Sequence, residues 1–256
     1  MTLADHARAY AARLEPDGFL SHTSAAALWG LPLPRRLDPR IHVSQPHGHR
    51  AVRTRGVIGH HLVISDRELT VLDGIPITTP ERTWSDLAGW IDLEALVAAG
   101  DRVIWHRAPL AHLDALVEVA RRHPGRRGRP ARLAALALVS DRADSAPESV
   151  LRVRIARSGL PTPLANPLLR TASGAWVGQP DLAWPEYREV VEYEGDGHRT
   201  DRAQWRTDLR RVPRFEDDGW HVNRAGGDDL ADGSRWLLRL LARRLRAKGW
   251  NGELRL

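Results

Sequence analysis

The sequence predicts an α/β protein built from two domains. Three observations support this: β-branched runs alternate with helical segments, helix-capping signals recur, and one segment rich in arginine, glycine and proline divides the chain. We expect a mixed, helix-rich N-terminal domain over residues 1–120. A connector with a short helix follows over residues 121–142, and residues 143–256 form a C-terminal domain that combines helices with a β-hairpin.

Composition narrows the class of protein. The chain has 256 residues, with 38 Lys+Arg against 32 Asp+Glu, a formal net charge of +6, and Lys248 is its single lysine. The absence of cysteine excludes disulfides, thiolate zinc sites and cysteine nucleophiles. No apolar run approaches the roughly 20 residues of a membrane-spanning helix, and the N-terminus lacks a signal pattern. We therefore expect a cytoplasmic protein without a membrane partner, and the basic balance weakly favours nucleic acid.

The N-terminal domain shows both helical and strand patterns. Residues 21–30 begin with hydroxyl side chains suited to capping and end at glycine, which predicts a short helix. The β-branched runs 41–44 and 57–64 predict strands. A second helical start lies at Thr79-Pro80, and apolar residues recur at helical spacing from there to residue 122.

Ten of the twelve histidines precede residue 125. A histidine metal site would need convergent ligands at a helical or paired-loop spacing. Neither His47 and His49 nor the adjacent pair His60 and His61 shows such a spacing. We expect these histidines to be solvated side chains of loops and strands.

Residues 121–132 form the clearest internal boundary. They contain six arginines, two glycines, two prolines and no acid, a composition that does not predict a packed element. This segment is expected to be a solvated connector, with a phosphate-binding arm as the alternative.

Two motifs of the N-terminal half resemble a known module. Residues 21–31, SHTSAAALWGL, and residues 74–83, GIPITTPERT, are similar to the AbiEi-type antitoxin and transcriptional-regulator-like region of actinobacterial proteins. The resemblance covers roughly residues 5–105. Only about 20 residues precede Ser21, too few for a complete three-helix DNA-binding unit, so it implies a regulator-like region rather than an operator-binding domain.

Glu148 lies at the start of a predicted helix in the C-terminal half. Ser145 followed by Glu148 is the spacing of a capping box, and Pro147 suits a first helical turn. Gly159 ends the helix. Taken alone, capping accounts for Glu148 completely.

Two apolar runs around a polar, proline-containing turn predict a hairpin with its turn near residues 185–188. Alternation along the second strand puts Glu192 and Glu194 on one face, and hairpin pairing puts Asp181 beside Glu192. Three crowded carboxylates repel one another unless a cation neutralises them. The pattern therefore indicates a divalent site for Mg²⁺ or Mn²⁺, with an exposed hairpin of solvated acids as the alternative.

After the second strand, the sequence offers an imidazole and many guanidinium groups. Residues 195–198 form a loop that delivers His198, and the arginine-dense segment 199–214 follows. A helix carrying these arginines beside a metal site would bind a phosphate backbone. The alternative is a solvated helix face in which Asp208 forms ion pairs with its arginine neighbours.

These residues resemble a known nuclease family. Glu148, Asp181, Glu192-Tyr193-Glu194-Gly195, His198 and the segment GWHV at 219–222 are similar to a domain-of-unknown-function family related to very-short-patch-repair (Vsr-like) endonucleases of the PD-(D/E)XK superfamily. The match spans roughly residues 143–230. It implies a restriction-endonuclease-like mixed sheet flanked by helices, with the acids at one edge.

The resemblance also implies roles for individual residues. Asp181, Glu192 and Glu148 would bind Mg²⁺ or Mn²⁺, and His198 would transfer a proton. Glu194 occupies the usual position of the superfamily's lysine and would hold a second ion or a water molecule. Arg211 would contact a DNA phosphate or pair with Asp208, and from the arginine-dense segment itself we expect Arg206 and Arg210 to contact phosphates as well.

The expected function is thus metal-dependent hydrolysis of DNA phosphodiesters by an endonuclease with a regulator-like N-terminal domain. The alternative is a non-catalytic DNA-binding or antitoxin-like regulatory protein that uses the nuclease fold as a platform.

Overall fold

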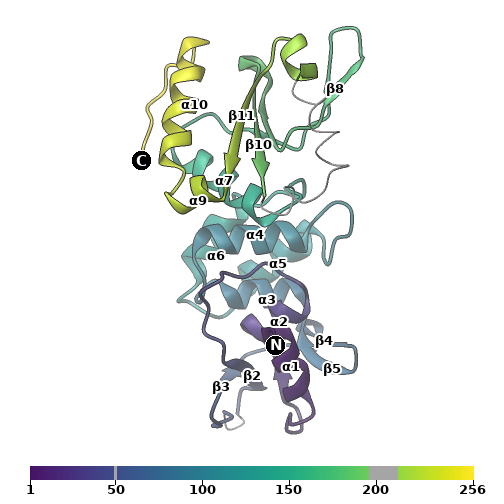
Figure 1. Cartoon of the computed structure of the whole chain (residues 1–256). Helices are drawn as coiled ribbons and strands as arrows, with labels where there is room; N and C mark the ends of the chain where they lie inside the picture. Colours follow the sequence, from purple (N-terminus) through teal and green to yellow (C-terminus); the bar gives the residue numbers. More distant parts are fainter. Residues whose placement is uncertain (49–50, 196–212) are drawn as a thin grey trace. The chain divides into compact units, whose positions relative to one another are not determined.

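A computed structural model describes residues 1–48, 51–195 and 213–256 of the chain (Figure 1). The chain divides into two compact units, residues 1–141 and residues 142–256, which are described here one at a time. Both units contain helices and strands, so the predicted α/β class is confirmed.

Unit 1 contains a five-stranded mixed sheet with the order β3-β2-β1-β5-β4. The long strands β2 and β3 run parallel, while β1 joins β2 in antiparallel and β5 in parallel pairing. Asp73 and Gly74 both have positive φ and turn β4 back into β5. The strands are β1 (Phe19–Leu20), β2 (Ile41–Pro46), β3 (Val57–Leu62), β4 (Leu69–Leu72) and β5 (Ile75–Thr78).

The helices of unit 1 supply the rest of its core. Small and aliphatic side chains of α1, α2 and the sheet form one buried cluster, comprising Ala7, Leu20, Ala25, Ile41, Val43 and Ile77. Trp84 of α3 is fully buried and donates a hydrogen bond to the Leu96 carbonyl of α4 (2.8 Å). The helices are α1 (Leu3–Ala11), α2 (His22–Leu28), α3 (Pro80–Leu87), α4 (Leu93–Val103), α5 (Leu113–Arg122) and α6 (Arg129–Leu136), with a 3₁₀ turn at Asp66–Glu68.

Most side chains of residues 121–132 are exposed, as expected of a solvated connector, but the prediction that this composition builds no packed element is wrong. This segment holds the end of α5 and the start of α6, and it belongs to unit 1. Arg132 is 1% exposed, and its guanidinium donates to the carbonyls of Ala120 (3.4 Å) and Gly125 (2.8 Å). Backbone carbonyl groups thus accept the hydrogen bonds of a buried guanidinium, although the composition of the segment predicts that this arginine is exposed to solvent.

Unit 2 is built around a four-stranded sheet with the order β11-β10-β9-β6. The predicted hairpin is confirmed, because β9 and β10 pair antiparallel across a 3₁₀ turn at Pro185–Tyr187. Strand β11 then adds in parallel to β10, which makes the sheet mixed. The strands are β6 (Leu164–Ala165), β9 (Leu182–Trp184), β10 (Glu189–Glu194) and β11 (His221–Gly226), with a separate hairpin of β7 (Leu169–Arg170) and β8 (Trp176–Gly178).

Apolar clusters lie on both faces of this sheet. On one face, α7 (Ala146–Arg157) and α10 (Arg235–Ala247) pack against Leu182, Trp184 and Val191. On the other, Val190 contacts a cluster that includes Val177 of β8 and Phe215. Helix α9 (Gly227–Ala231) follows β11. In the described part of the chain, no helix has both the length and the apolar character needed to cross a membrane.

Candidate functional site

The antiparallel pairing of β9 with β10 places Asp181, just before β9, opposite Glu192, which lies within β10. Leu182 pairs with Val191 in the antiparallel register, so the next position places Asp181 directly opposite Glu192. Asp181 also accepts a 2.6 Å hydrogen bond at Oδ2 from the backbone N–H of Tyr193. A charged acceptor at this distance is held firmly, so the strand fixes the orientation of the Asp181 carboxylate.

The face of the sheet that carries these acids follows from the side-chain alternation. Val191 and Tyr193 pack with α7 and α10, whereas Val190 belongs to the cluster on the opposite face. Glu192 and Glu194 therefore share the face of Val190. Glu194 is exposed, and its Oε1 forms a 3.1 Å ion pair with Arg224 of β11, which is also exposed.

Glu148 lies near the N-terminus of α7 and is 8% exposed. Its N–H donates to Ser145 Oγ (3.4 Å), which confirms Ser145 as the N-cap. The other half of the predicted capping box differs, because the Glu148 carboxylate accepts from the N–H of Asp144 (3.0 Å), one residue before the cap. The carboxylate is therefore turned away from the cap itself, and it meets a residue from outside the helix.

That residue is Asn166, which the sequence prediction missed. Its side chain donates to Glu148 Oε2 (2.9 Å) and to the Arg142 carbonyl (3.0 Å). Its backbone N–H donates to the carbonyl of Asp181 (2.9 Å). Asn166 thus connects the helix-borne Glu148 to the strand that carries Asp181. The Asn166-Pro167 pair signals a turn in the sequence, but it does not reveal either of these partners.

Six residues singled out in the sequence lie outside the described residues: His49, His198, Arg206, Asp208, Arg210 and Arg211. The neighbouring Arg214 is described, and its guanidinium lies 5.6 Å from the ring centroid of Trp176. Trp176 is 52% exposed. Lys248, the single lysine, forms a 2.9 Å ion pair with buried Glu189 at the start of β10. Glu189 lies five residues before Glu194, so the lysine pairs with the opposite end of the strand.

A second cluster of functional groups lies in unit 1, where His22, His42 and His60 converge. Each offers a ligand atom within 4.8 Å of those of the other two, and of the residues described, this is the group of three or more His, Asp or Glu that could hold a metal ion. The expected solvated state is confirmed for the exposed His61 but is wrong for His60, which stacks on His22. Parallel pairing of β2 with β3 carries His60 inward.

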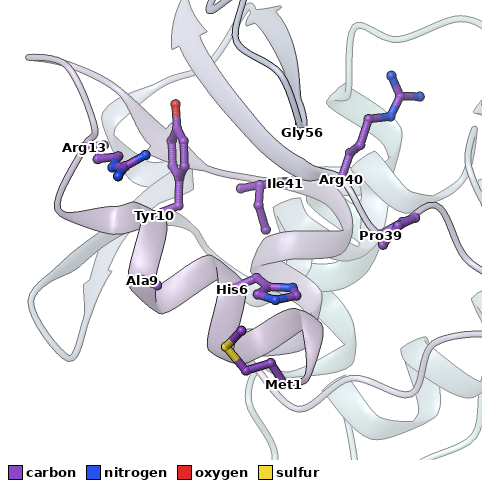
Figure 2. A pocket seen from close by; sticks show the side chains of 9 residues that line it. All are labelled: Met1, His6, Ala9, Tyr10, Arg13, Pro39, Arg40, Ile41 and Gly56. Carbon is purple, nitrogen blue, oxygen red and sulfur yellow. The ribbon is translucent and has the colours of Figure 1, made fainter.

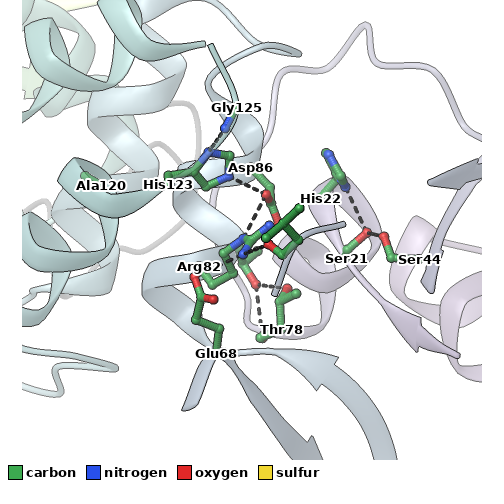
Figure 3. A network of polar contacts seen from close by, with 12 residues as sticks. Ser21, His22, Ser44, Glu68, Thr78, Arg82, Asp86, Ala120, His123 and Gly125 are labelled. Carbon is green, nitrogen blue, oxygen red and sulfur yellow. Dashed lines mark hydrogen bonds and ion pairs between the residues drawn. The ribbon is translucent and has the colours of Figure 1, made fainter. Parts of the chain in front are cut away.

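A polar network lies beside this cluster (Figure 3). Asp86 Oδ1 accepts from Arg82 Nε (3.0 Å) and contacts His123 Nε2 (2.7 Å), and Arg82 reaches Glu68 Oε1 (3.0 Å). Burial raises the pKa of Asp86, but the bond from His123 and the charges of His22 and Arg82 outweigh it and hold that pKa below its ordinary value. The network keeps a negative charge in the interior of unit 1.

A pocket of about 490 Å³ opens between α1 and the start of β2 (Figure 2). Its polar lining comes from His6, Tyr10, Arg13 and Arg40. Arg40 is held by Asp38 through a 2.6 Å ion pair. None of the described lining residues carries a carboxylate, so the pocket has no counterpart of the acids Asp181 and Glu192.

Comparison with known proteins identifies distant relatives. No family model matches the chain. Two uncharacterized proteins of Mycobacterium tuberculosis, from strains CDC 1551/Oshkosh and ATCC 25618/H37Rv, are each 28% identical to it over 208 residues. The alignment covers 81% of this chain and 73% of each relative. The similarity therefore extends across both units.

Proposed function

We propose that the protein is a metal-dependent DNA endonuclease whose active site is centred on Asp181 and Glu192. The observation that carries this proposal is the antiparallel register of β9 and β10, which, extended by one position, places Asp181 opposite Glu192, with Asp181 oriented by the Tyr193 N–H. Two carboxylates so close favour a cation between them. Unit 1 would then be the regulator-like part of the chain.

The donor set fits Mg²⁺ or Mn²⁺. Asp181 and Glu192 supply carboxylate oxygens, the ligands that hard divalent cations prefer, and neither cysteine nor histidine belongs to this described pair. When bound, such an ion would polarise a phosphodiester and lower the pKa of a water molecule. Glu148 would support the site through Asn166, since these two residues connect α7 to the backbone of Asp181.

The remaining proposed roles concern DNA and proton transfer. His198 would transfer a proton, Glu194 would hold a second ion or a water molecule, and Arg206, Arg210 and Arg211 would contact phosphates. Arg214 beside the exposed Trp176 adds a guanidinium and an aromatic face, a combination suited to single-stranded nucleic acid. The net charge of +6 supports the same choice of partner.

The proposal is tested by cleavage of supercoiled plasmid and mismatched duplex DNA with Mg²⁺ or Mn²⁺. Asp181→Asn and Glu192→Gln should each lower the cleavage rate by about 100-fold or more, because each removes a charge that would bind the ion. Glu186→Gln is the matched control, since Glu186 is an exposed acid in the turn between the same two strands. Its rate should equal that of the wild type.

Equal cleavage by the wild type and both site variants would show a contaminating nuclease and overturn the proposal. DNA binding that persists without any metal-dependent cleavage would instead identify the regulatory alternative, in which the nuclease fold serves as a platform. Binding of that kind would weaken steeply as salt is raised.

A further inference from the structure

The histidine cluster of unit 1 is assembled by three separate segments. His42 lies on β2 and His60 on β3, and His22 is the first residue of α2. Ser44 of β2 is paired with His60 in the register, and Ser44 Oγ lies 2.5 Å from Ser21 Oγ, which contacts His22 Nδ1 at 2.8 Å (Figure 3). Two serines thus fix the position of α2 against the strand that carries His42.

The nitrogen atoms of the cluster are close to one another. His42 Nδ1 lies 3.0 Å from His60 Nε2. Zinc binds histidine nitrogen at about 2.0–2.1 Å, so two such ligands on one tetrahedral ion lie about 3.3 Å apart. The observed separation is therefore within a few tenths of an ångström of that expected for two ligands of one ion.

Burial makes these imidazoles neutral. His22 and His42 are 6% and 1% exposed. The ring of Trp90 lies nearly perpendicular to all three imidazoles, and its centroid is 4.6 Å from that of His42 and 5.6 Å from that of each of the others. Burial lowers the pKa of His22 to about 3 and the pKa values of His42 and His60 to about 4.

One nitrogen of the cluster also lacks a hydrogen bond. His42 Nε2 is buried and has no hydrogen-bond partner within the described part of the chain. Buried polar atoms are usually paired, and an exception in a cluster of three imidazoles indicates a missing ligand. Either nitrogen of His42 is therefore a candidate metal ligand: Nδ1 because it faces His60, and Nε2 because it has no hydrogen-bond partner in the described part of the chain.

We propose that His22, His42 and His60 form a binding site for a late first-row divalent metal, Zn²⁺ in particular. Imidazole ligands favour zinc, copper and nickel over Mg²⁺, which prefers oxygen. Asp86 adds negative charge nearby: its effect on His22 and His60 opposes that of burial and favours a positive charge at the cluster. This site is separate from the carboxylate pair of unit 2 and does not depend on the proposed nuclease activity.

The geometry ranks the three ligands. His22 and His60 are stacked, with ring centroids 4.1 Å apart and planes 17° from parallel. The rings of His42 and His60 are also nearly parallel, but their centroids lie farther apart, at 5.0 Å, and His42 Nδ1 lies 3.0 Å from His60 Nε2. His42 and His60 are therefore the inner pair. His22, which adopts the uncommon φ of +49°, completes the shell by rotating its ring away from Ser21.

Metal content and zinc titration of the full chain test this site. The background is the Asp181→Asn/Glu192→Gln double variant, which removes the carboxylate pair as a competing site. After dialysis against EDTA, this protein should bind about one equivalent of Zn²⁺. Adding His42→Gln or His60→Gln should weaken binding by at least about 100-fold, and His22→Gln by about tenfold, following the ranking of the ligands.

His61→Gln is the matched control, because His61 is the exposed neighbour of His60 on the same strand. It should leave zinc binding unchanged. Far-ultraviolet circular dichroism checks that each variant folds. If a histidine variant unfolds, X-ray absorption of the zinc-loaded protein that keeps all three histidines counts its imidazole ligands directly. A zinc shell without imidazole would overturn the proposal. Zinc uptake by the His42→Gln and His60→Gln variants equal to that of the double-variant background would overturn it as well.

Discussion

A single residue, Asn166, links the carboxylate of Glu148 to the backbone of Asp181. It is 7% exposed, and its backbone has φ of +46°, in the left-handed region that asparagine tolerates better than most residues. Its amide donates to Glu148, and its backbone N–H donates to the Asp181 carbonyl. Asn166 is thus a positioning residue, which acts through Glu148 and Asp181.

Two substitutions of Asn166 separate the effect of its side-chain hydrogen bonds from the effect of its left-handed backbone conformation. Asn166→Gly keeps the left-handed backbone and removes both side-chain hydrogen bonds, so it should destabilise unit 2 by about 2–3 kcal/mol. Asn166→Ala should cost roughly 1 kcal/mol more, because alanine strains that backbone. Urea unfolding measures both values. Plasmid cleavage should fall about 10- to 100-fold in each folded variant, and an Asn166→Ala protein as stable and active as the wild type would contradict this role.

The carboxylate pair of unit 2 could be predicted from the sequence, whereas the histidine cluster of unit 1 could not. Asp181 and Glu192 could be paired because strand periodicity and a proline-containing turn define a hairpin register. The histidine cluster could not, because His22, His42 and His60 are separated by 20 and 18 residues. They meet through the parallel pairing of β2 with β3 and through the docking of α2, and neither contact leaves a local pattern.

At the scale of elements, Lys248 joins the end of α10 to the start of β10. It is the C-cap of α10, and its Nζ lies 2.9 Å from Glu189 Oε1. Glu189 is 1% exposed and also accepts a 2.8 Å hydrogen bond from Asn223 of β11. The single lysine of an arginine-rich chain thus neutralises a buried carboxylate at the opposite end of the strand from Glu194.

Lys248→Met should destabilise unit 2 by about 1–3 kcal/mol, because it leaves the buried Glu189 without its cation, and the partial exposure of Lys248 moderates the effect. A double-mutant cycle with Glu189→Gln isolates the pair, and the double variant should recover part of the loss. Arg239→Met removes an exposed charge from the same helix and should change the unfolding free energy by less than about 0.5 kcal/mol. If Arg239→Met lowered the free energy of unfolding as much as Lys248→Met, the effect would not be specific to the pair of Lys248 and Glu189.

Caps and periodicity located several elements well. Thr79 and Pro80 begin α3 as predicted, and the helix predicted over residues 21–30 is α2. The long helical pattern from residue 79 to residue 122 is instead divided into three helices. The hairpin of β4 and β5 was missed although Asp73-Gly74 is a strong turn signal. Ser21 occupies the N-cap position of α2, but its hydroxyl makes no capping hydrogen bond, because it bonds to Ser44 and His22 instead.

At the scale of the whole molecule, the two units differ in the histidines that they bury. Among the described residues, unit 1 contains three with pKa values of about 3 to 4, whereas the histidine of unit 2 with a lowered pKa is His221, again mainly through burial. A buried histidine that stays neutral in the folded state takes up a proton when the chain unfolds below pH 6.5. Acid therefore favours unfolding of unit 1 more strongly than unfolding of unit 2.

This asymmetry predicts that unit 1 unfolds first on acidification. The stability that His22, His42 and His60 contribute is present above about pH 6.5 and is lost as the pH falls toward 4, because only the unfolded chain binds the protons in that window. Uptake of up to three protons corresponds to a slope of up to about 4 kcal/mol per pH unit near pH 5.5. Hydrogen exchange read by mass spectrometry, at pH 7 and pH 5 with EDTA present, follows each unit separately. His60→Gln should reduce the slope by about a third and His61→Gln should leave it unchanged, whereas earlier loss of protection in unit 2 would contradict the assignment.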